Sequence, residues 1–234
     1  MNAVPVLRVD VVIPVKYGLS YLSQALASVA EQDAETDVFV VDDGAGPTLR
    51  DVVASAVQDF AGDHRTSVQV VVNRRQPGIG GARNTGASVG NAPLVAFLDA
   101  DDVWPSARSS ILADVLRELA DPAMAFGMVE QFTDGTAGID DLPAPPRPGM
   151  LAGGMLITRA TWDLVGGFDE ELPVGEFIDW VARARAAGAV EVITDELVLR
   201  RRIHGDNTTL HRRDARQTYA DVVRRHLHRG SGGA

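Results

Sequence analysis

The residues best suited to chemistry are three carboxylates that follow a short apolar run. Residues 94–98 are predicted to form a buried strand, and Asp99, Asp101 and Asp102 come where that strand ends. Clustered carboxylates repel one another and resist burial, so we expect a positive partner, most simply a divalent cation. In open α/β sheets, ligands bind beyond the carboxyl ends of the strands. The pattern therefore predicts a metal-assisted site for a phosphate-bearing ligand.

A second acidic pair, Asp42 and Asp43, follows another predicted strand at residues 38–41. One of these carboxylates could accept hydrogen bonds from a ribose or from a base N–H. The alternative is turn chemistry, because Asp-Asp-Gly favours a tight turn that leads into a helix. With the cluster at Asp99 expected at the same sheet edge, the functional interpretation is favoured.

A segment rich in glycine and arginine occupies residues 73–86. It does not complete G-x-G-x-x-G, because Arg83 stands where the third glycine belongs, and it lacks the lysine that a P-loop requires after Gly86. Arg83, at a predicted helix start, could face a diphosphate or hold the acidic edge in place. Arg74 and Arg75 are each more simply explained as solvated side chains.

These motifs need elements to position them, and the first half of the chain alternates strand-like and helix-like segments. Predicted strands cover residues 9–15, 38–41, 68–72 and 94–98. Predicted helices cover residues 21–29, 48–60 and 80–89, with Ser20 as the N-cap of the first. This alternation favours a parallel sheet covered by helices on both faces.

The second half of the chain does not continue this regular alternation of strands and helices. Its predicted elements are a helix at 106–119, a strand at 123–129, a loop or lid at 131–149, a strand at 153–157, a helix at 176–187, a basic helix at 212–229 and a disordered tail at 230–234. We expect one domain over residues 1–210, with a nucleotide-binding part at about 9–104 and an acceptor part at about 105–210. Residues 211–234 would form the basic helix and tail, which packs on the domain or, as the less favoured alternative, on a membrane surface.

Composition narrows the class of protein. The 234 residues are 45% hydrophobic and 23% charged, which is ordinary for a globular domain with a real core. No apolar run or signal pattern predicts a transmembrane segment, and the absence of cysteine fits a cytoplasmic protein. The net charge of −10 argues against nucleic-acid binding. Since Lys16 is the sole lysine, arginines and a metal ion would make the phosphate contacts. Whether the chain forms a homodimer stays open.

A competing motif overlaps the acidic cluster. Residues 99–103 satisfy D-x-D-x-[TV], the nucleophile pattern of haloacid-dehalogenase-like phosphatases. Such enzymes usually place the motif after their first strand and need a lysine downstream of it. Here at least three predicted strands precede the motif, and Lys16 is upstream. The phosphatase therefore remains the less favoured alternative.

Six segments occur in the order and spacing of a known family. They are Val11-Val12-Ile13-Pro14-Val15, Val40-Val41-Asp42-Asp43-Gly44, Ala82-Arg83-Asn84-Thr85-Gly86, Phe97-Leu98-Asp99-Ala100-Asp101-Asp102, Gly166-Gly167-Phe168-Asp169-Glu170 and Arg202-Ile203-His204-Gly205-Asp206-Asn207. Over residues 9–207 the chain resembles family 2 glycosyltransferases with the GT-A fold. The resemblance implies an α/β domain with a mostly parallel central sheet flanked by helices.

The resemblance also implies a donor site for a nucleoside diphosphate sugar, most simply a UDP-sugar. The residues that would bind the donor are Pro14, Val15, Tyr17, Asp42, Asp43, Arg83, Asp99 and Ala100. Asp101 and His204 would hold a Mn²⁺ or Mg²⁺ ion that bridges the diphosphate and offsets its charge. The acceptor is unknown.

The catalytic base is the point where the chain departs from the family. Inverting transfer by a single displacement needs a base for the acceptor hydroxyl, usually the Asp of a Glu-Asp pair. Here Glu176 is retained, but Phe177 replaces the Asp. We favour Glu176 as the base over Asp179, which lies one helical turn further on; otherwise Glu176 caps the helix dipole and Asp179 is solvated. Phe177 also keeps open a non-catalytic protein that binds nucleotide sugars.

Overall fold

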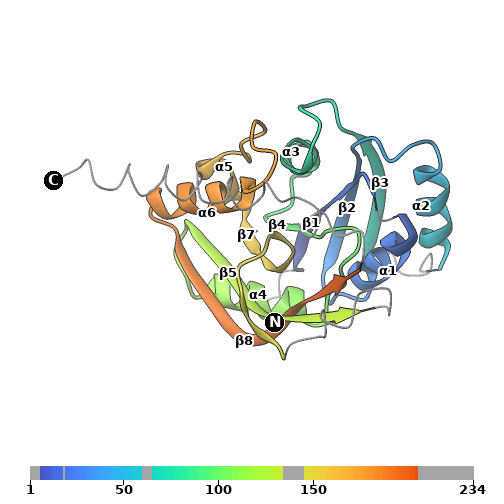
Figure 1. The fold of residues 1–234 in the computed structure, drawn as a ribbon. Coiled ribbons are helices and arrows are strands. Elements are labelled where there is room, and N and C mark those ends of the chain that lie inside the picture. The colour runs from blue at the N-terminus through green and yellow to red at the C-terminus, as the bar shows by residue number, and fades with distance from the viewer. Residues whose placement is uncertain (1–5, 18, 60–64, 134–144, 205–234) are drawn as a thin grey trace.

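The computed structural model describes residues 6–17, 19–59, 65–133 and 145–204 (Figure 1). In chain order the elements are β1 (Arg8–Val15), α1 (Leu19–Ala30), β2 (Glu35–Asp42), α2 (Leu49–Gln58), β3 (Thr66–Val72), α3 (Ile79–Val89), β4 (Leu94–Phe97), α4 (Arg108–Arg117), β5 (Ala123–Thr133), β6 (Arg147–Gly149), the 3₁₀ turn η2 (Ala152–Gly154), β7 (Leu156–Thr158), α5 (Arg159–Val165), α6 (Glu176–Ala186) and β8 (Val190–Ile203).

One eight-stranded sheet runs through the protein in the order β3-β2-β1-β4-β7-β5-β6, with β8 paired to β5. The strands β3, β2, β1 and β4 are parallel, which confirms the predicted α/β class. Beyond β4 the sheet is mixed, because β7 runs antiparallel to both β4 and β5. The long β8 runs parallel to β5. The first half of the chain therefore forms the parallel part of the sheet, and the second half extends it.

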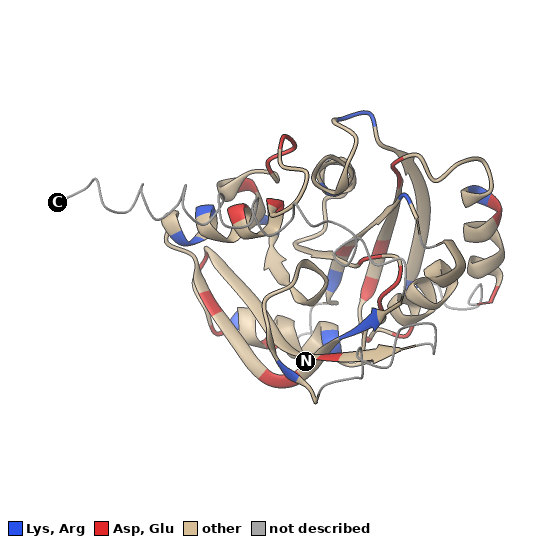
Figure 2. Ribbon diagram, in the orientation of Figure 1, with Lys and Arg blue, Asp and Glu red and all other residues tan. Residues whose placement is uncertain are grey.

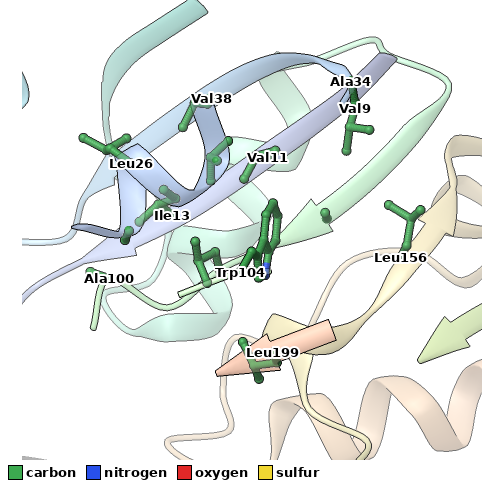
Figure 3. Close-up of a cluster of buried hydrophobic side chains, with 14 of the residues drawn as sticks. Val9, Val11, Ile13, Leu26, Ala34, Val38, Ala100, Trp104, Leu156 and Leu199 are labelled. Carbon is green, nitrogen blue, oxygen red and sulfur yellow. The ribbon is translucent and has the colours of Figure 1, made fainter. Parts of the chain in front are cut away.

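Helices cover both faces of the sheet. Successive side chains of β1 point to opposite faces, and apolar side chains on each face need a layer to pack against. Val11 and Ile13 pack in a core with α1, α2 and α4, and Figure 3 shows Trp104 in the same cluster. Val12 faces the other way, into a second core with α3, α5 and α6. Trp180 lies fully buried in this second core. The acidic segment after β4 thus begins on a strand held between two cores.

The predicted elements are confirmed in the first half, apart from shifts of a few residues at their ends. Ser20 was expected as an N-cap but lies inside α1. In the second half, residues 152–154 form η2, so the predicted strand at 153–157 begins only at Leu156. The sequence missed α5, whose seven residues are too few for a helical pattern, and β8, whose run of charged residues hides the strand. β5 also extends into the expected loop, as far as Thr133.

Some predictions fall outside the described residues. These are the middle of the expected loop (134–144), the last three residues of the Arg202–Asn207 motif, and the basic helix and tail after residue 211. Within the part of the chain that the structure describes, no helix is long and apolar enough to cross a membrane.

Candidate functional site

Three neighbouring strands end at one edge of the sheet and bring the acidic turns together. In the parallel ladders Val15 lies opposite Asp42, and Val12 lies opposite Phe97. The turn after β2 and the turn after β4 therefore flank the end of β1, as the sequence predicts. Figure 2 shows the acidic turn after β4 lying against the basic carboxyl end of β8. This edge of the sheet is the candidate site.

The carboxylates after β2 organise the backbone around them. Asp42 Oδ1 accepts hydrogen bonds from the N–H groups of Gly44 (3.0 Å) and Ala45 (2.9 Å). Asp43 accepts from the N–H of Gly78 (3.0 Å) and from Asn73 Nδ2 (2.7 Å). Asp43 thereby anchors the segment that leads into α3. The turn chemistry expected as an alternative is present, and it builds one wall of the site.

The end of β1 supplies the neighbouring wall. Val15 is buried and Pro14 is half-buried, whereas Tyr17 is 73% exposed. Lys16 Nζ lies 5.9 Å from the centroid of the Tyr17 ring. An exposed aromatic ring beside the sheet edge is a surface on which a planar base could stack.

The three aspartates after β4 have different surroundings. Asp99 is 39% exposed and accepts a hydrogen bond from Arg83 Nη2 at 2.8 Å. Asp102 is buried and accepts the backbone N–H of Arg202 at 2.8 Å. Asp101 faces His204. Asp99 is therefore the carboxylate most open to a ligand, while Asp102 ties the turn to β8.

Asp101 and His204 form the pair that fits a divalent cation. Asp101 Oδ2 lies 3.0 Å from His204 Nε2. This contact is a hydrogen bond between the two side chains. Adjacent ligands at about 2.1 Å from an octahedral ion also lie roughly 3 Å apart, so the same spacing would accommodate Mn²⁺ or Mg²⁺. Among the described residues no group of three or more His, Asp or Glu side chains is arranged for a metal. The other coordination positions would fall to ligand oxygens and water, as is usual for Mg²⁺.

Burial and crowding raise the pKa values of two of these aspartates. Burial is the larger cause of the raised pKa of Asp101, and the charge of Asp99 adds to it. Burial also raises the pKa of Asp102 well above its ordinary value, and Asp101 and Asp99 raise it further. The crowded carboxylates thus favour a nearby positive charge, as the sequence analysis expected.

Arg83 joins the acidic turn to α6. Its Nη1 donates to Glu176 Oε1 at 2.7 Å, and its Nη2 donates to Asp99. The Arg83 side chain is only 4% exposed, and its guanidinium lies 5.6 Å from the centroid of the Phe168 ring. Burial alone would lower the pKa of Arg83, but the charges of Asp99 and Glu176 raise it above the ordinary value. Arg83 is thus a permanent cation between two carboxylates.

The start of α6 separates the two candidate bases. Gly175 adopts a left-handed conformation (φ 85°) immediately before the helix, so Glu176 is its first residue. Asp179 is 4% exposed and accepts from Arg183 Nε at 2.8 Å. Phe177 packs in the second core, with its ring 6.4 Å from that of Phe126. The structure therefore brings Glu176 to Asp99 through Arg83, whereas Asp179 pairs along its own helix.

The structure also shows site residues for which the sequence had suggested no such contacts. Arg202 Nε donates to the carbonyl oxygen of Asp101 (2.9 Å), and Arg202 Nη2 donates to Gln24 (2.6 Å). Trp104 Nε1 donates to the carbonyl oxygen of Gly153 at 2.8 Å. Arg202 thus holds the acidic turn against α1, and Trp104 holds it against η2. The run of arginines before His204 was the available signal, but sequence alone does not say which arginine faces the turn.

Comparisons with known proteins extend over most of this chain. Residues 10–142 match the family model "Glycosyl transferase family 2". The succinoglycan biosynthesis protein ExoU of Rhizobium meliloti is 29% identical over 210 residues, covering 81% of this chain and 60% of that protein. The pre-mycofactocin glycosyltransferase of Mycobacterium tuberculosis is 30% identical over 200 residues, covering 77% and 40%. An uncharacterized glycosyltransferase of Nostoc is 33% identical over 112 residues, covering 47% and 33%. The chain thus spans 33% to 60% of the length of these relatives.

Solved structures share the fold. S. aureus TarS 1-349 in complex with UDP-GlcNAc superposes with a TM-score of 0.67 at 18% identity, covering 94% of this chain and 65% of that chain. Its complex with UDP gives a TM-score of 0.65 at 19% identity, covering 97% and 74%. At this identity the likeness concerns the fold alone, and it confirms the predicted GT-A-like architecture.

Proposed function

The chain belongs to glycosyl transferase family 2, and from this premise we propose that it transfers a sugar from a nucleoside diphosphate sugar to a nucleophile on an acceptor. The observation that carries the proposal is the convergence of Asp99, Asp101, His204 and Glu176 around one sheet edge. They come from three segments that lie far apart in sequence, and a structural role alone does not call for so many ionisable groups in one place.

The donor would lie along the ends of β1, β2 and β4. Its base and ribose would contact Pro14, Val15, Tyr17, Asp42, Asp99 and Ala100, with Asp43 and Arg83 in support. The exposure of Tyr17 and Asp99 supports this assignment. A UDP-sugar is the donor we favour, because the TarS structures of similar fold are named as complexes with UDP and UDP-GlcNAc.

Asp101 and His204 would hold a Mn²⁺ or Mg²⁺ ion beside the diphosphate. Their 3.0 Å separation supports this assignment. When bound, the ion would neutralise charge on the diphosphate and stabilise it as a leaving group. Arg202 keeps the Asp101 backbone in place from the side of β8.

Glu176 would act as the base that accepts the acceptor proton, in a single displacement that inverts the anomeric centre. Its position at the first residue of α6, next to Arg83 and Asp99, supports this role over Asp179. Asp179, paired with Arg183, would then orient α6. We assign these roles to one catalytic domain over residues 1–210. A cytoplasmic location and a homodimer stay predictions.

A second candidate function rests on Phe177. An apolar ring packed in the core occupies the position at which the family usually carries its base, so a protein that binds nucleotide sugars without turnover is the alternative. The D-x-D-x-[TV] phosphatase is set aside, because the chain belongs to a different family.

The test is a thermal-shift panel of UDP, GDP, TDP and CDP sugars with and without Mn²⁺, since a ligand that binds the native state raises its stability. We expect a Mn²⁺-dependent rise in Tm with a UDP-sugar. Asp101→Ala should abolish the Mn²⁺ dependence, while the exposed Asp195→Ala control should keep it. Equal affinity with and without Mn²⁺ in the unmodified protein would rule out the metal assignment.

Turnover separates the two candidate functions. Glu176→Gln should keep donor binding and lose donor turnover, measured as nucleotide release. Full activity in Glu176→Gln would move the base to Asp179 or elsewhere. Donor binding without any turnover in the unmodified protein would favour the binding protein.

A further inference from the structure

Arg83 connects two parts of the site that the sequence keeps far apart. Arg83 lies on α3, Asp99 lies on the turn after β4, and Glu176 lies much further along the chain, at the start of α6. Arg83 contacts Asp99 Oδ1 at 2.8 Å and Glu176 Oε1 at 2.7 Å with two different nitrogens. Both contacts are charge-assisted hydrogen bonds, the stronger class in proteins.

The surroundings of Arg83 restrict it to this arrangement. Its side chain is 4% exposed, and Phe168 packs against its guanidinium. The next residue, Asn84, donates to the carbonyl oxygen of Phe168 (2.9 Å) and accepts its N–H (2.8 Å). The segment that leads to α6 is thus fastened to the same turn of α3 that carries Arg83. The guanidinium cannot swing to solvent without breaking this packing.

The contact with Arg83 also gives the two oxygens of the Glu176 carboxylate different surroundings. Arg83 occupies Oε1, and Oε2 accepts no hydrogen bond from the described residues. The Glu176 side chain is 9% exposed. One oxygen is therefore held in place while the other can accept a proton.

We propose that Arg83 is a positioning residue. It holds the carboxylate of Glu176 at a fixed position relative to Asp99, and so fixes the proposed base relative to the donor site. This inference rests on the proposed function. A lysine could not replace Arg83, because one ammonium lacks the planar fork that reaches two carboxylates at once. Misplacement of a reacting group by about 1 Å can cost on the order of 100-fold in rate.

The experiment compares Arg83→Lys with the unmodified protein and with Arg185→Gln, which removes an arginine from an exposed ion pair on α6. UDP affinity with Mn²⁺ is measured by calorimetry, and kcat and KM are measured for UDP-GlcNAc hydrolysis. We expect Arg83→Lys to keep the UDP Kd and the KM within about threefold and to lower kcat by about 100-fold. Arg185→Gln should leave all three unchanged.

Two outcomes would overturn the proposal. Unchanged kcat in Arg83→Lys would mean that the bridge does not serve turnover. A tenfold or larger loss of UDP affinity with unchanged kcat would make Arg83 a donor contact only. If the unmodified protein neither binds UDP nor hydrolyses UDP-GlcNAc, the proposed UDP-sugar function fails first, and that failure is visible before any variant is made.

A second measurement needs no activity and covers the case in which Arg83→Lys does not fold. Asp99→Asn and Glu176→Gln are combined in a double-mutant cycle of unfolding. If Arg83 bridges the two carboxylates, losing both leaves a buried unpaired cation. The double variant should then have an unfolding constant at least about threefold larger than the single effects predict. Additive effects would show that no bridge exists.

Discussion

Gly81 offers a test of how closely α3 is docked beside the site. A Cβ at Gly81 would overlap the carbonyl oxygen of Gln76 and lie 3.1 Å from its carbonyl carbon. At neighbouring Gly80 the nearest atom would be the carbonyl oxygen of Asp169, at 3.3 Å. Alanine is favoured over glycine in a helix by about 1 kcal/mol, so both substitutions gain that amount. At Gly80 the Asp169 oxygen must give way by only a few tenths of an ångström, whereas the overlap at Gly81 requires a larger displacement of backbone.

The two effects set the size of the expected change. Displacing a packed backbone costs about 1 to 3 kcal/mol or more. Because the added Cβ overlaps a backbone oxygen, we use the upper figure of about 3 kcal/mol, and after the helix gain of about 1 kcal/mol Gly81→Ala should lose about 2 kcal/mol net. In a chain of 234 residues this corresponds to a fall in Tm of about 4 to 8 °C. Gly80→Ala should stay within about 1 kcal/mol of the unmodified protein, because its gain offsets a milder contact. Since Arg83 lies two residues further on and is proposed to position Glu176, kcat for UDP-GlcNAc hydrolysis should fall in Gly81→Ala alone.

Thermal melts and urea unfolding of both variants supply the measurement. The reasoning is refuted if Gly81→Ala is as stable as Gly80→Ala. It is also refuted if Gly81→Ala loses stability while kcat is unchanged, because the shifted helix start carries Arg83.

Three further predictions concern single side chains. In calorimetry, His204→Ala should weaken UDP affinity by about tenfold or more when Mn²⁺ is present but not when it is absent, since even an outer-shell metal partner contributes that much. Equal losses of affinity in both conditions would contradict the metal assignment. Arg108 is fully buried, burial lowers its pKa to about 9, and its Nε and Nη1 lack partners among the described residues, while Nη2 donates to the carbonyl oxygen of Met155 and the guanidinium lies 3.9 Å from the centroid of the Trp104 ring. Arg108→Met should be neutral or stabilising by about 1 to 3 kcal/mol in urea unfolding, and a clear loss would show that the Met155 and Trp104 contacts outweigh the cost of burying the cation. Burial raises the pKa of Glu170, but hydrogen bonds from Asn84 and Gln76 and the charge of Arg75 lower it below the ordinary 4.5. The ionised Glu170 carboxylate therefore stabilises the folded protein above pH 4.5, and this stabilisation is lost as the pH falls through the lowered pKa. The difference in Tm between the unmodified protein and Glu170→Gln should then narrow in acid, and a difference that does not change with pH would refute the predicted direction.

Much of the parallel half of the fold follows from local patterns. Runs such as residues 9–15 are apolar on both faces, which is what a strand between two helical layers requires. The carboxylates Asp42 and Asp99 directly follow such runs, so their meeting at one sheet edge follows once the strands are parallel. The six spaced motifs then identify the family, whose model matches residues 10–142.

In the second half α4, β5 and α6 were predicted, but other elements resisted prediction for two physical reasons. β8 is a 14-residue strand in which only Val198 and Leu199 are fully buried, so no alternating pattern marks it. Its stability comes from pairing with β5, a strand distant in the sequence. Short elements such as α5 have too few residues to show a period. These elements depend on long-range contacts that local propensity does not encode.

The sequence by itself determined which chemical groups this protein carries and at which strand ends they lie. Asp99 and Asp101 were found that way, whereas Glu176, at the start of a predicted helix, was found through the resemblance to the family. The tertiary structure alone decided which groups meet. The bridge between Val103 and Arg200 holds the turn after β4 against β8 and so brings His204 to Asp101, and the packing of α3 beside the start of α6 places Arg83 between Asp99 and Glu176. Such pairings join residues about 100 positions apart, and they are set by the packing of whole elements rather than by the residues beside each group.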